Sequence, residues 1–226
     1  SKWAQIKRQK AVVDQKRGQL FSKLVREITI AAKQGGNPAM NYKLRLVLDR
    51  AKEAGMQKEA IERAIKRGTG EEAGGELEEI IYEGYGPFGT AFLIEAATDN
   101  KNRTVNNIKQ LFAGHRGSLG TPGSVAWQFV TRGQILVERT GDDMSDIELA
   151  AIDAGAEDVR QSPEGLEIYT RPLDLNEVKE KVLAGGGKIV RAEVIKESTQ
   201  GVDLTDEQKA KIDDLFADLE NDEDVI

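Results

Sequence analysis

The chain has 226 residues, of which 39% are hydrophobic, 31% are charged and only 5% are aromatic, a composition typical of a globular protein with an aliphatic core. It contains no cysteine and a single histidine, His115, which excludes disulfides, zinc–thiolate sites and histidine-based metal clusters, so we expect no cofactor. No apolar run approaches the roughly 20 residues that span a bilayer, and the first residues show no signal-peptide pattern. We therefore expect no membrane partner.

The net charge of −7 conceals a strong segregation of charge along the chain. Residues 1–70 contain 17 lysines and arginines but six acidic residues, a net charge of +11, whereas the remainder carries −18. Such an asymmetry favours the binding of a polyanion by the basic part. The alternative interpretation is that these side chains merely solvate the exposed faces of helices.

Residues 1–72 are predicted to form a basic helical domain. Between Lys16 and Lys33, apolar residues recur at helical spacing on one face, and basic residues lie on the opposite face. Two further helices are expected at 41–54 and 57–66, each ended by a glycine. Residues 1–15 show only a weak apolar period, so we expect this arm to become ordered on its partner.

Residues 73–130 together with 200–226 are predicted to form a middle α+β domain. Strands are expected at 80–83, 91–96 and 125–129, with a helix at 102–113. This order provides no helix to cover its sheet, whereas the helix that begins after Thr205 needs a sheet to cover. We therefore expect the end of the chain to return to the middle domain.

Residues 131–199 are predicted to form a ferredoxin-like domain, because their elements follow the order β-α-β-β-α-β. Ser145 and Glu148 are spaced as a capping box for its first helix. The predicted fold is α+β, with an N-terminal three-helix domain followed by two α/β domains. The ferredoxin-like domain is expected to be an insertion in the middle domain.

The candidate nucleic-acid-binding residues are basic side chains, because lysine and arginine neutralise phosphates with little choice of sequence. In the arm and the first helix they are Lys2, Lys7, Arg8, Lys10, Lys16, Arg17, Lys23 and Arg26. Trp3 is expected to act as an apolar or stacking anchor. Lys101 and Arg103 form a second candidate phosphate contact, although residues 99–104 are equally well interpreted as a helix N-cap cluster.

Two glycine-rich loops, at 84–89 and 117–123, match neither the Walker nor the dinucleotide-binding fingerprint. Their glycines are predicted to supply positive φ angles and hairpin tips. Alternatively, Tyr85 and Phe88 could form a contact loop that stacks on bases or inserts into a groove. Trp127, in a segment that alternates like a strand, is interpreted as a core residue.

The sequence offers no convincing catalytic constellation, and we expect no enzymatic activity. The neighbouring acids Asp142 and Asp143, like Asp213 and Asp214, have no histidine or cysteine beside them and are interpreted as solvated. His115 is expected at the surface near a helix C-terminus, where a cation is favoured.

Several segments together resemble the YebC family over essentially the whole chain. They are Ser1–Lys7, Asp14–Leu24, Ile61–Gly68, Tyr82–Pro87, Asp99–Thr104 and Gly120–Val125. The resemblance implies one helical and two α/β domains. It also implies a cytoplasmic location and DNA binding, because bacterial members are catalogued as cytoplasmic, DNA-binding, "probable transcriptional regulatory" proteins. Mitochondrial relatives are described as translational activators, and a ribosomal role is proposed for bacterial members.

Three functions are therefore considered. The first is a nucleic-acid-binding regulator of gene expression, with DNA as the target. The second is a translation factor that docks on ribosomal RNA with the same arm and reaches inward with the 84–89 loop. The third is a protein adaptor whose acidic C-terminal half meets a basic partner. No small-molecule substrate is expected, and the sequence does not define an oligomeric state.

Overall fold

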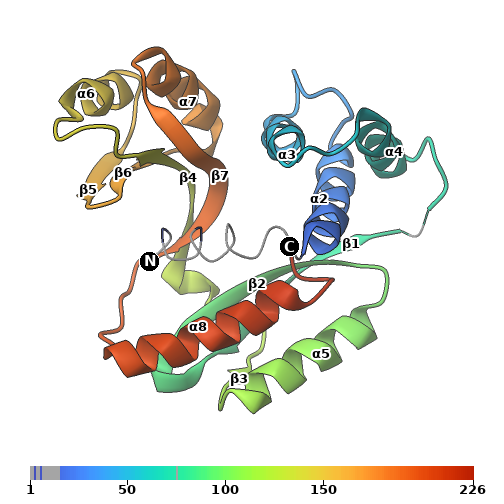
Figure 1. The fold of residues 1–226 in the computed structure, drawn as a ribbon. Helices are drawn as coiled ribbons and strands as arrows, with labels where there is room; N and C mark the ends of the chain where they lie inside the picture. The colour runs from blue at the N-terminus through green and yellow to red at the C-terminus, as the bar shows by residue number, and fades with distance from the viewer. Residues whose placement is uncertain (1–2, 4–5, 7–15, 75) are drawn as a thin grey trace. The chain divides into compact units, whose positions relative to one another are not determined.

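A computed structural model describes Trp3, Ile6, residues 16–74 and residues 76–226 of the chain (Figure 1). Three helices come first, and two sheets with their own helices follow, so the protein has the predicted α+β fold. One compact unit comprises residues 129–198 together with Trp3. The other comprises the described part of residues 4–128 together with residues 199–226. The three-domain boundaries drawn from the sequence stay a prediction.

The three N-terminal helices form where the apolar periodicity places them. They are α2 (Arg17–Ala32), α3 (Tyr42–Glu53) and α4 (Lys58–Thr69). Their inward faces form one core, in which Leu24, Ile28 and Leu44 are almost completely buried. Gly68 lets α4 approach α2 closely, because a Cβ atom there would lie 2.4 Å from the carbonyl oxygen of Thr29.

The Asn41 side chain joins the end of α2 to the start of α3. Its Oδ1 accepts a hydrogen bond from the backbone N–H of Leu44 and so caps α3. Its amide group donates to the carbonyl oxygens of Ala31 and Gly35, both at 2.8 Å. One buried side chain therefore satisfies backbone groups at both helix ends.

The middle sheet is built from β1 (Glu78–Tyr85), β2 (Ala91–Thr98) and β3 (Ser118–Leu119), in the order β2-β1-β3 with antiparallel pairing. The 3-10 turn η1 (Pro87–Gly89) joins β1 to β2. Two helices belong with this sheet, α5 (Lys101–Gly114) and α8 (Asp206–Asn221). Phe92 of β2, Phe112 of α5 and Leu215 of α8 share one core. The end of the chain thus returns to this sheet, as predicted from the unpaired apolar faces.

The last residues of the chain extend the same arrangement. The N–H of Ala97 donates to the carbonyl oxygen of Asp224 at 2.8 Å, and the N–H of Ile226 donates to that of Glu95 at 2.9 Å. Residues 224–226 therefore pair with β2 along the strand edge that β1 does not occupy. The Thr205–Gln208 capping box that starts α8 is also present.

The inserted unit contains β4 (Phe129–Glu138), α6 (Ser145–Asp153), β5 (Asp158–Ser162), β6 (Gly165–Thr170), α7 (Leu175–Ala184) and β7 (Lys188–Ser198), with the 3-10 turn η3 (Pro172–Asp174) before α7. Its strands are all antiparallel and lie in the order β5-β6-β4-β7. This is the predicted ferredoxin-like arrangement.

Two local predictions are wrong. Residues 126–128 form the 3-10 turn η2 (Ala126–Gln128) instead of a strand, and the third strand of the middle sheet is the short β3. Ser145 does not cap α6, because it is the first helical residue and its hydroxyl donates to Asp143. The Asp143 carboxylate also accepts from the Ser145 N–H at 2.9 Å, so it satisfies the first N–H group of the helix in a local turn.

Candidate nucleic-acid interface

Three of the predicted basic residues, Lys16 at the N-cap of α2 and Lys23 and Arg26 within it, are bound by the end of the chain and by β2. The Lys16 ammonium donates to the Asn221 side chain, and the Lys23 ammonium donates to the carbonyl oxygen of Glu220. Arg26 Nη1 donates to the carbonyl oxygen of Ala97 at 2.7 Å. The basic face of α2 is therefore brought against β2 and the C-terminus of α8.

Burial has an electrostatic consequence at Lys23. Desolvation lowers the pKa of this lysine, although the nearby carboxylates of Glu220, Asp222 and Glu27 act in the opposite direction. A partly buried ammonium that already has a carbonyl partner is less available to a phosphate than a fully solvated one.

Asp224 is the centre of the charged cluster in this region. Its carboxylate, with a side chain only 3% exposed, lies 3.2 Å from Arg26 and 2.9 Å from Arg103. It also accepts the Thr104 hydroxyl at 2.7 Å. A buried carboxylate needs such partners, because an unpaired charge in the interior is strongly unfavourable.

The second candidate contact, at the start of α5, is likewise paired within the chain. Lys101 forms an ion pair with Glu78, and Arg103 bonds to Asp99 as well as to Asp224. The hydrogen bonds to Asp224 and Asp99 raise the pKa of Arg103, and the same guanidinium lowers the pKa of Asp99. Asn100 caps α5 through the N–H of Arg103. The N-cap interpretation is thus confirmed, while phosphate contact stays a prediction.

Arg17 differs from these residues because it is exposed at the start of α2. Its guanidinium carbon lies 5.3 Å from the centre of the Phe21 ring, in a cation–π arrangement that leaves its N–H groups available for an anion.

The structure reveals further exposed basic residues that the sequence analysis did not select. They lie on α3 and α4 and are Lys43, Lys52, Arg63, Lys66 and Arg67. Part of this pattern follows from the helix dipole, since Lys52, Lys66 and Arg67 stand in the last turns of their helices. These residues contribute to the +11 count, and separate helical wheels of residues 42–53 and 58–69 place them outside the apolar stripes.

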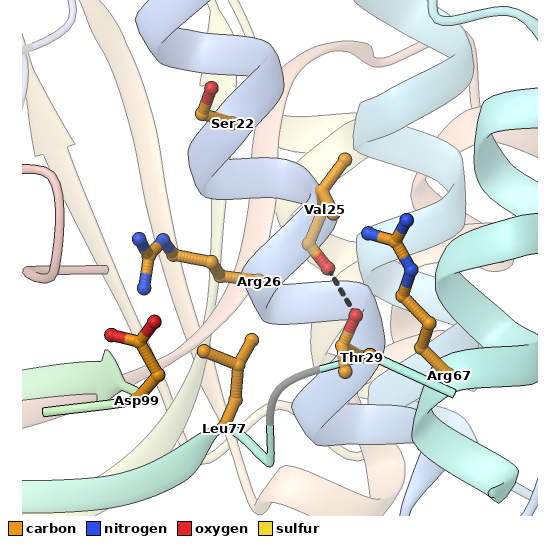
Figure 2. Close-up of a pocket in the computed structure, with 8 residues that line it drawn as sticks. Ser22, Val25, Arg26, Thr29, Arg67, Leu77 and Asp99 are labelled. Atoms are coloured by element: carbon orange, nitrogen blue, oxygen red, sulfur yellow. Dashed lines mark hydrogen bonds between the residues drawn. The ribbon is translucent and has the colours of Figure 1, made fainter. Parts of the chain in front are cut away.

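A cavity of about 320 Å³ lies beside α2 and is lined in part by Arg26, Arg67 and Asp99 (Figure 2). Val25 and Leu77 add apolar surface, and the Thr29 hydroxyl turns back to the carbonyl oxygen of Val25 at 2.8 Å. Charges of both signs line this cavity, and Arg26 already pairs with Asp224. It is therefore a poorer candidate for an anion than the exposed surface of α3 and α4.

The glycine-rich loop at 84–89 has two exposed rings, Tyr85 and Phe88, with 40% and 41% of their surfaces accessible. Phe88 has a φ angle of 62°, in the left-handed region that a bulky side chain rarely adopts. Its ring lies 6.0 Å from Nζ of Lys211. Both rings are thus placed where a contact loop would need them, and contact itself stays a prediction.

Gly89 and Gly123 have the predicted positive φ angles, 74° and 90°, whereas other glycines of the two loops serve close packing. A Cβ atom at Gly84 would lie 2.7 Å from the Phe112 ring, and one at Gly117 would lie 2.5 Å from the carbonyl oxygen of Tyr85. These positions need glycine for lack of space, and neither has a positive φ angle. The two loops therefore lie against each other.

The carboxylate of Glu83 holds the second loop in place. It accepts the backbone N–H groups of Gly123, Val125 and Ala126 at 2.6, 2.7 and 2.8 Å. These hydrogen bonds, that from Gly123 first, lower the pKa of Glu83. Backbone amides that could have cradled a phosphate are thus occupied by a carboxylate of the chain itself.

Trp127 is not a core residue, contrary to the interpretation from the sequence. Its ring is 64% exposed, and its Nε1 donates to the carbonyl oxygen of Ser124 at 3.1 Å. The physical reason is the 3-10 turn, because η2 lacks the two-residue alternation that would have turned the ring inward. The loop composition around it, rich in glycine with a proline, was the available signal.

The remaining candidates are Trp3 and the basic residues of the arm, together with His115. Trp3 is helical and only 5% exposed, so its indole does not present a free face in this structure. Lys2, Lys7, Arg8 and Lys10 lie outside the described residues. His115 stands at the C-cap of α5, as expected, where its Nε2 is 2.6 Å from the Asp218 carboxylate.

Two family models match this chain and together cover most of it. Residues 1–71 match the TACO1/YebC protein N-terminal domain, and residues 77–226 match the TACO1/YebC second and third domain. The chain belongs to the TACO1/YebC family.

Curated relatives match along the whole length of this TACO1/YebC chain. A protein of Thermoanaerobacter pseudethanolicus is 47% identical over 100% of this chain and 92% of its own length. One of Dictyoglomus thermophilum is 48% identical over 100% and 91%. Both are named probable transcriptional regulatory proteins, so the relatives are described as regulators rather than enzymes.

A crystal structure of a conserved hypothetical protein from Aquifex aeolicus has the same fold as this TACO1/YebC chain. The TM-score is 0.88 at 43% sequence identity, covering 100% of this chain and 94% of the other. Among the described residues of the present structure, no helix is both long and apolar enough to cross a membrane.

Proposed function

We propose that this chain is a nucleic-acid-binding regulator of gene expression that acts in the cytoplasm, with duplex DNA as its first target. The observation that carries the proposal is the segregation of charge, with +11 in residues 1–70 and −18 in the rest. The names of the relatives support a regulatory role. The exposure of basic side chains on α3 and α4 supports contact with a polyanion.

The contacts would be made to phosphates and would carry little sequence information. Lysine and arginine displace condensed counterions from the backbone, and the resulting affinity falls steeply with salt. Arg17 and the exposed residues of α3 and α4 can bind a phosphate without giving up the internal partners that Lys16, Lys23 and Arg26 have. The proposed set also includes the residues predicted from the sequence, namely Lys2, Trp3, Lys7, Arg8, Lys10, Lys16, Lys23, Arg26, Lys101 and Arg103.

Binding through Lys16, Lys23 or Arg26 would require an exchange of partners. Each donates to a group of β2 or of the C-terminal segment, and Arg26 also faces the buried Asp224 carboxylate. A phosphate would have to replace these acceptors, which reduces the net gain. We therefore expect the larger share of the affinity to come from the side chains that are already exposed.

The test is a titration of duplex DNA with the wild-type chain and with the charge-reversal variant K43E/R63E at several salt concentrations. For the wild type, the logarithm of the association constant should fall linearly with the logarithm of salt concentration. The variant should bind more weakly, and its slope should be smaller by about 1 for each phosphate that it no longer neutralises.

The matched control is K181E/K209E, which makes the same change in net charge outside residues 1–70. Both control residues are exposed lysines of helices in the acidic part of the chain. Equal reductions in affinity for the two variants would show that the affinity depends on net charge alone and not on the surface of α3 and α4. An affinity of the wild type that does not change with salt would refute polyanion binding.

A second candidate is a translation factor that binds the ribosome through its RNA. The observation that favours it is the exposure of Tyr85, Phe88 and Trp127, because aromatic rings recognise unpaired bases and duplex DNA offers none at its surface. Co-sedimentation with ribosomes that is abolished in K43E/R63E, together with the absence of a DNA footprint, would favour this function. A specific footprint without co-sedimentation would favour the first.

A further inference from the structure

Two exposed aromatic side chains, one at the end of β1 and one in η2, donate to the same backbone carbonyl. The Tyr85 hydroxyl and the Trp127 indole N–H both donate to the oxygen of Ser124, each at 3.1 Å. The polar tips of both rings are thereby satisfied inside the protein, while 40% of Tyr85 and 64% of Trp127 stay accessible. We call this pair, with Ser124 between them, the Tyr85–Trp127 surface.

The loop that carries Trp127 is held in place by hydrogen bonds to Glu83 and by a buried side chain. The Glu83 carboxylate accepts three of its backbone N–H groups, and the carbonyl oxygen of Glu83 accepts the N–H of Gly120 at 2.7 Å. Val125, two residues before the tryptophan, is completely buried. The rings are therefore fixed before any partner arrives, which reduces the entropy lost on binding.

The chemistry around the two rings indicates what they can bind. Residues 84–92 and 117–128 contain no lysine, arginine, aspartate or glutamate, in a chain of which 31% is charged. The one adjacent carboxylate, Glu83, points into the loop and is fully used there. The surface thus offers flat apolar faces and no charge, and it is suited to a partner that presents a flat uncharged ring.

We propose that the Tyr85–Trp127 surface stacks on an unpaired nucleobase of single-stranded nucleic acid. Every base has a π-face, and stacking on aromatic side chains is tolerant of sequence. The phosphates of such a strand would be bound by the basic residues of the helices. This inference therefore rests on the nucleic-acid binding proposed above, applied to an unpaired strand instead of duplex DNA, and it identifies the residues that would contact a base. Trp127, the more exposed ring, is the principal contact.

The experiment measures binding of the wild type, W127A and W127F to oligo(A), to oligo(dA) and to an abasic oligodeoxynucleotide of equal length. W127A should bind oligo(A) and oligo(dA) about tenfold more weakly, the reduction expected for one stacked base. W127F retains a ring and should recover most of that affinity. None of the variants should differ on the abasic strand, which offers phosphates alone.

Tryptophan fluorescence provides a second, independent readout. Trp127 and Trp3 are the only tryptophans of the chain, so subtracting the W127F signal isolates the emission of Trp127. Oligo(A) should quench this emission and protect it from acrylamide, whereas the abasic strand should do neither. A urea midpoint of W127A equal to that of the wild type confirms that the fold is intact.

The outcomes separate this inference from the proposed function. If the wild type binds all three strands with a steep salt dependence but W127A binds oligo(A) equally well, the stacking surface is refuted and phosphate binding stands. If the wild type binds no strand at all, the stacking surface is refuted, whereas the proposed binding of duplex DNA is decided by its own salt titration. A preference for oligo(A) over oligo(dA) would assign the base to RNA, and the reverse would assign it to DNA.

Discussion

The Nη1 atom of Arg26 lies 3.2 Å from Oδ1 of Asp224, so that the third turn of α2 is tied to the third residue from the end of the sequence. Arg103 and Thr104, at the start of α5, bind the same carboxylate. One acidic side chain thus joins the N-terminal helices, α5 and the C-terminal segment. It also explains why the basic face of α2 is only partly open to an external anion.

Replacing Asp224 by asparagine should destabilise the protein. Removing one partner of a buried ion pair leaves the other charge uncompensated. This penalty is moderated here because Arg103 and Arg26 retain partial contact with water, and we expect a decrease of about 2–4 kcal/mol in the free energy of unfolding. Urea denaturation measures it. E223Q changes the same charge at the exposed neighbouring residue and should have almost no effect, and equal effects of D224N and E223Q would contradict this role.

Glu83 should make stability depend on pH. Its pKa is lowered in the folded state, so its contribution is fully present above the unfolded value of about 4.3 and is lost as the pH falls through the folded value. At pH 7, the free energy of unfolding of E83Q should therefore be about 1.5–3 kcal/mol lower than that of the wild type. As the pH falls through the lowered folded pKa of Glu83, the two proteins should converge, because the protonated glutamate resembles glutamine.

The control for this titration is E79Q, at an exposed glutamate of the same strand. Urea unfolding of wild type, E83Q and E79Q between pH 3 and pH 7 provides the comparison. If the gap between wild type and E83Q stayed constant over the whole range, the Glu83 charge would have no part in holding the loop.

Gly117 and Gly114 form a matched pair that tests the packing of the loops. G117A places a methyl group 2.5 Å from the backbone oxygen of Tyr85, which cannot rotate away, and we expect a decrease of about 1–3 kcal/mol in unfolding free energy. Gly114 is the last residue of α5, and a methyl group added there would have no atom within 4 Å. G114A should be neutral or stabilise by up to about 1 kcal/mol, since alanine favours helix.

Phe88 offers a way to separate binding from stability. F88G relieves a left-handed conformation that costs about 1–2 kcal/mol for a non-glycine residue, while it removes a ring that is only partly buried. The two effects oppose each other, so thermal unfolding should change little. If the 84–89 loop contacts nucleic acid, binding should fall nonetheless; unchanged binding would leave Phe88 with a structural role alone.

The fold was predictable where apolar residues recur with a clear period. The three N-terminal helices, the β-α-β-β-α-β order and the return of α8 to the middle sheet all follow from apolar faces that must be covered. The prediction failed at residues 125–129, because a short run of alternating residues cannot distinguish a strand from a 3-10 turn. The capping box was predicted wrongly at α6, because the N–H of Glu148 donates to the carbonyl oxygen of Met144 and the Ser145 N–H donates to Asp143.

The candidate site was less predictable than the fold. Charge counting identified the basic segment, but nothing in residues 16–26 indicates that Asp224, nearly 200 positions later, lies against Arg26. Pairing between residues so far apart depends on tertiary structure. Trp127 was misplaced for a related reason, because its exposure depends on the loop that Glu83 holds and not on its own neighbours.

The chain leaves the middle sheet and returns to it at a single point. The carbonyl oxygen of Gln128, just before β4, accepts both the N–H and the hydroxyl of Thr199, just after β7, at 2.7 and 3.0 Å. Residues 129–198 thus begin and end next to two hydrogen-bonded residues, Gln128 and Thr199. A short linker in place of residues 129–198 would join Gln128 to Thr199. The rest of the protein could then be produced without the ferredoxin-like unit, and the contribution of that unit to nucleic-acid binding could be measured.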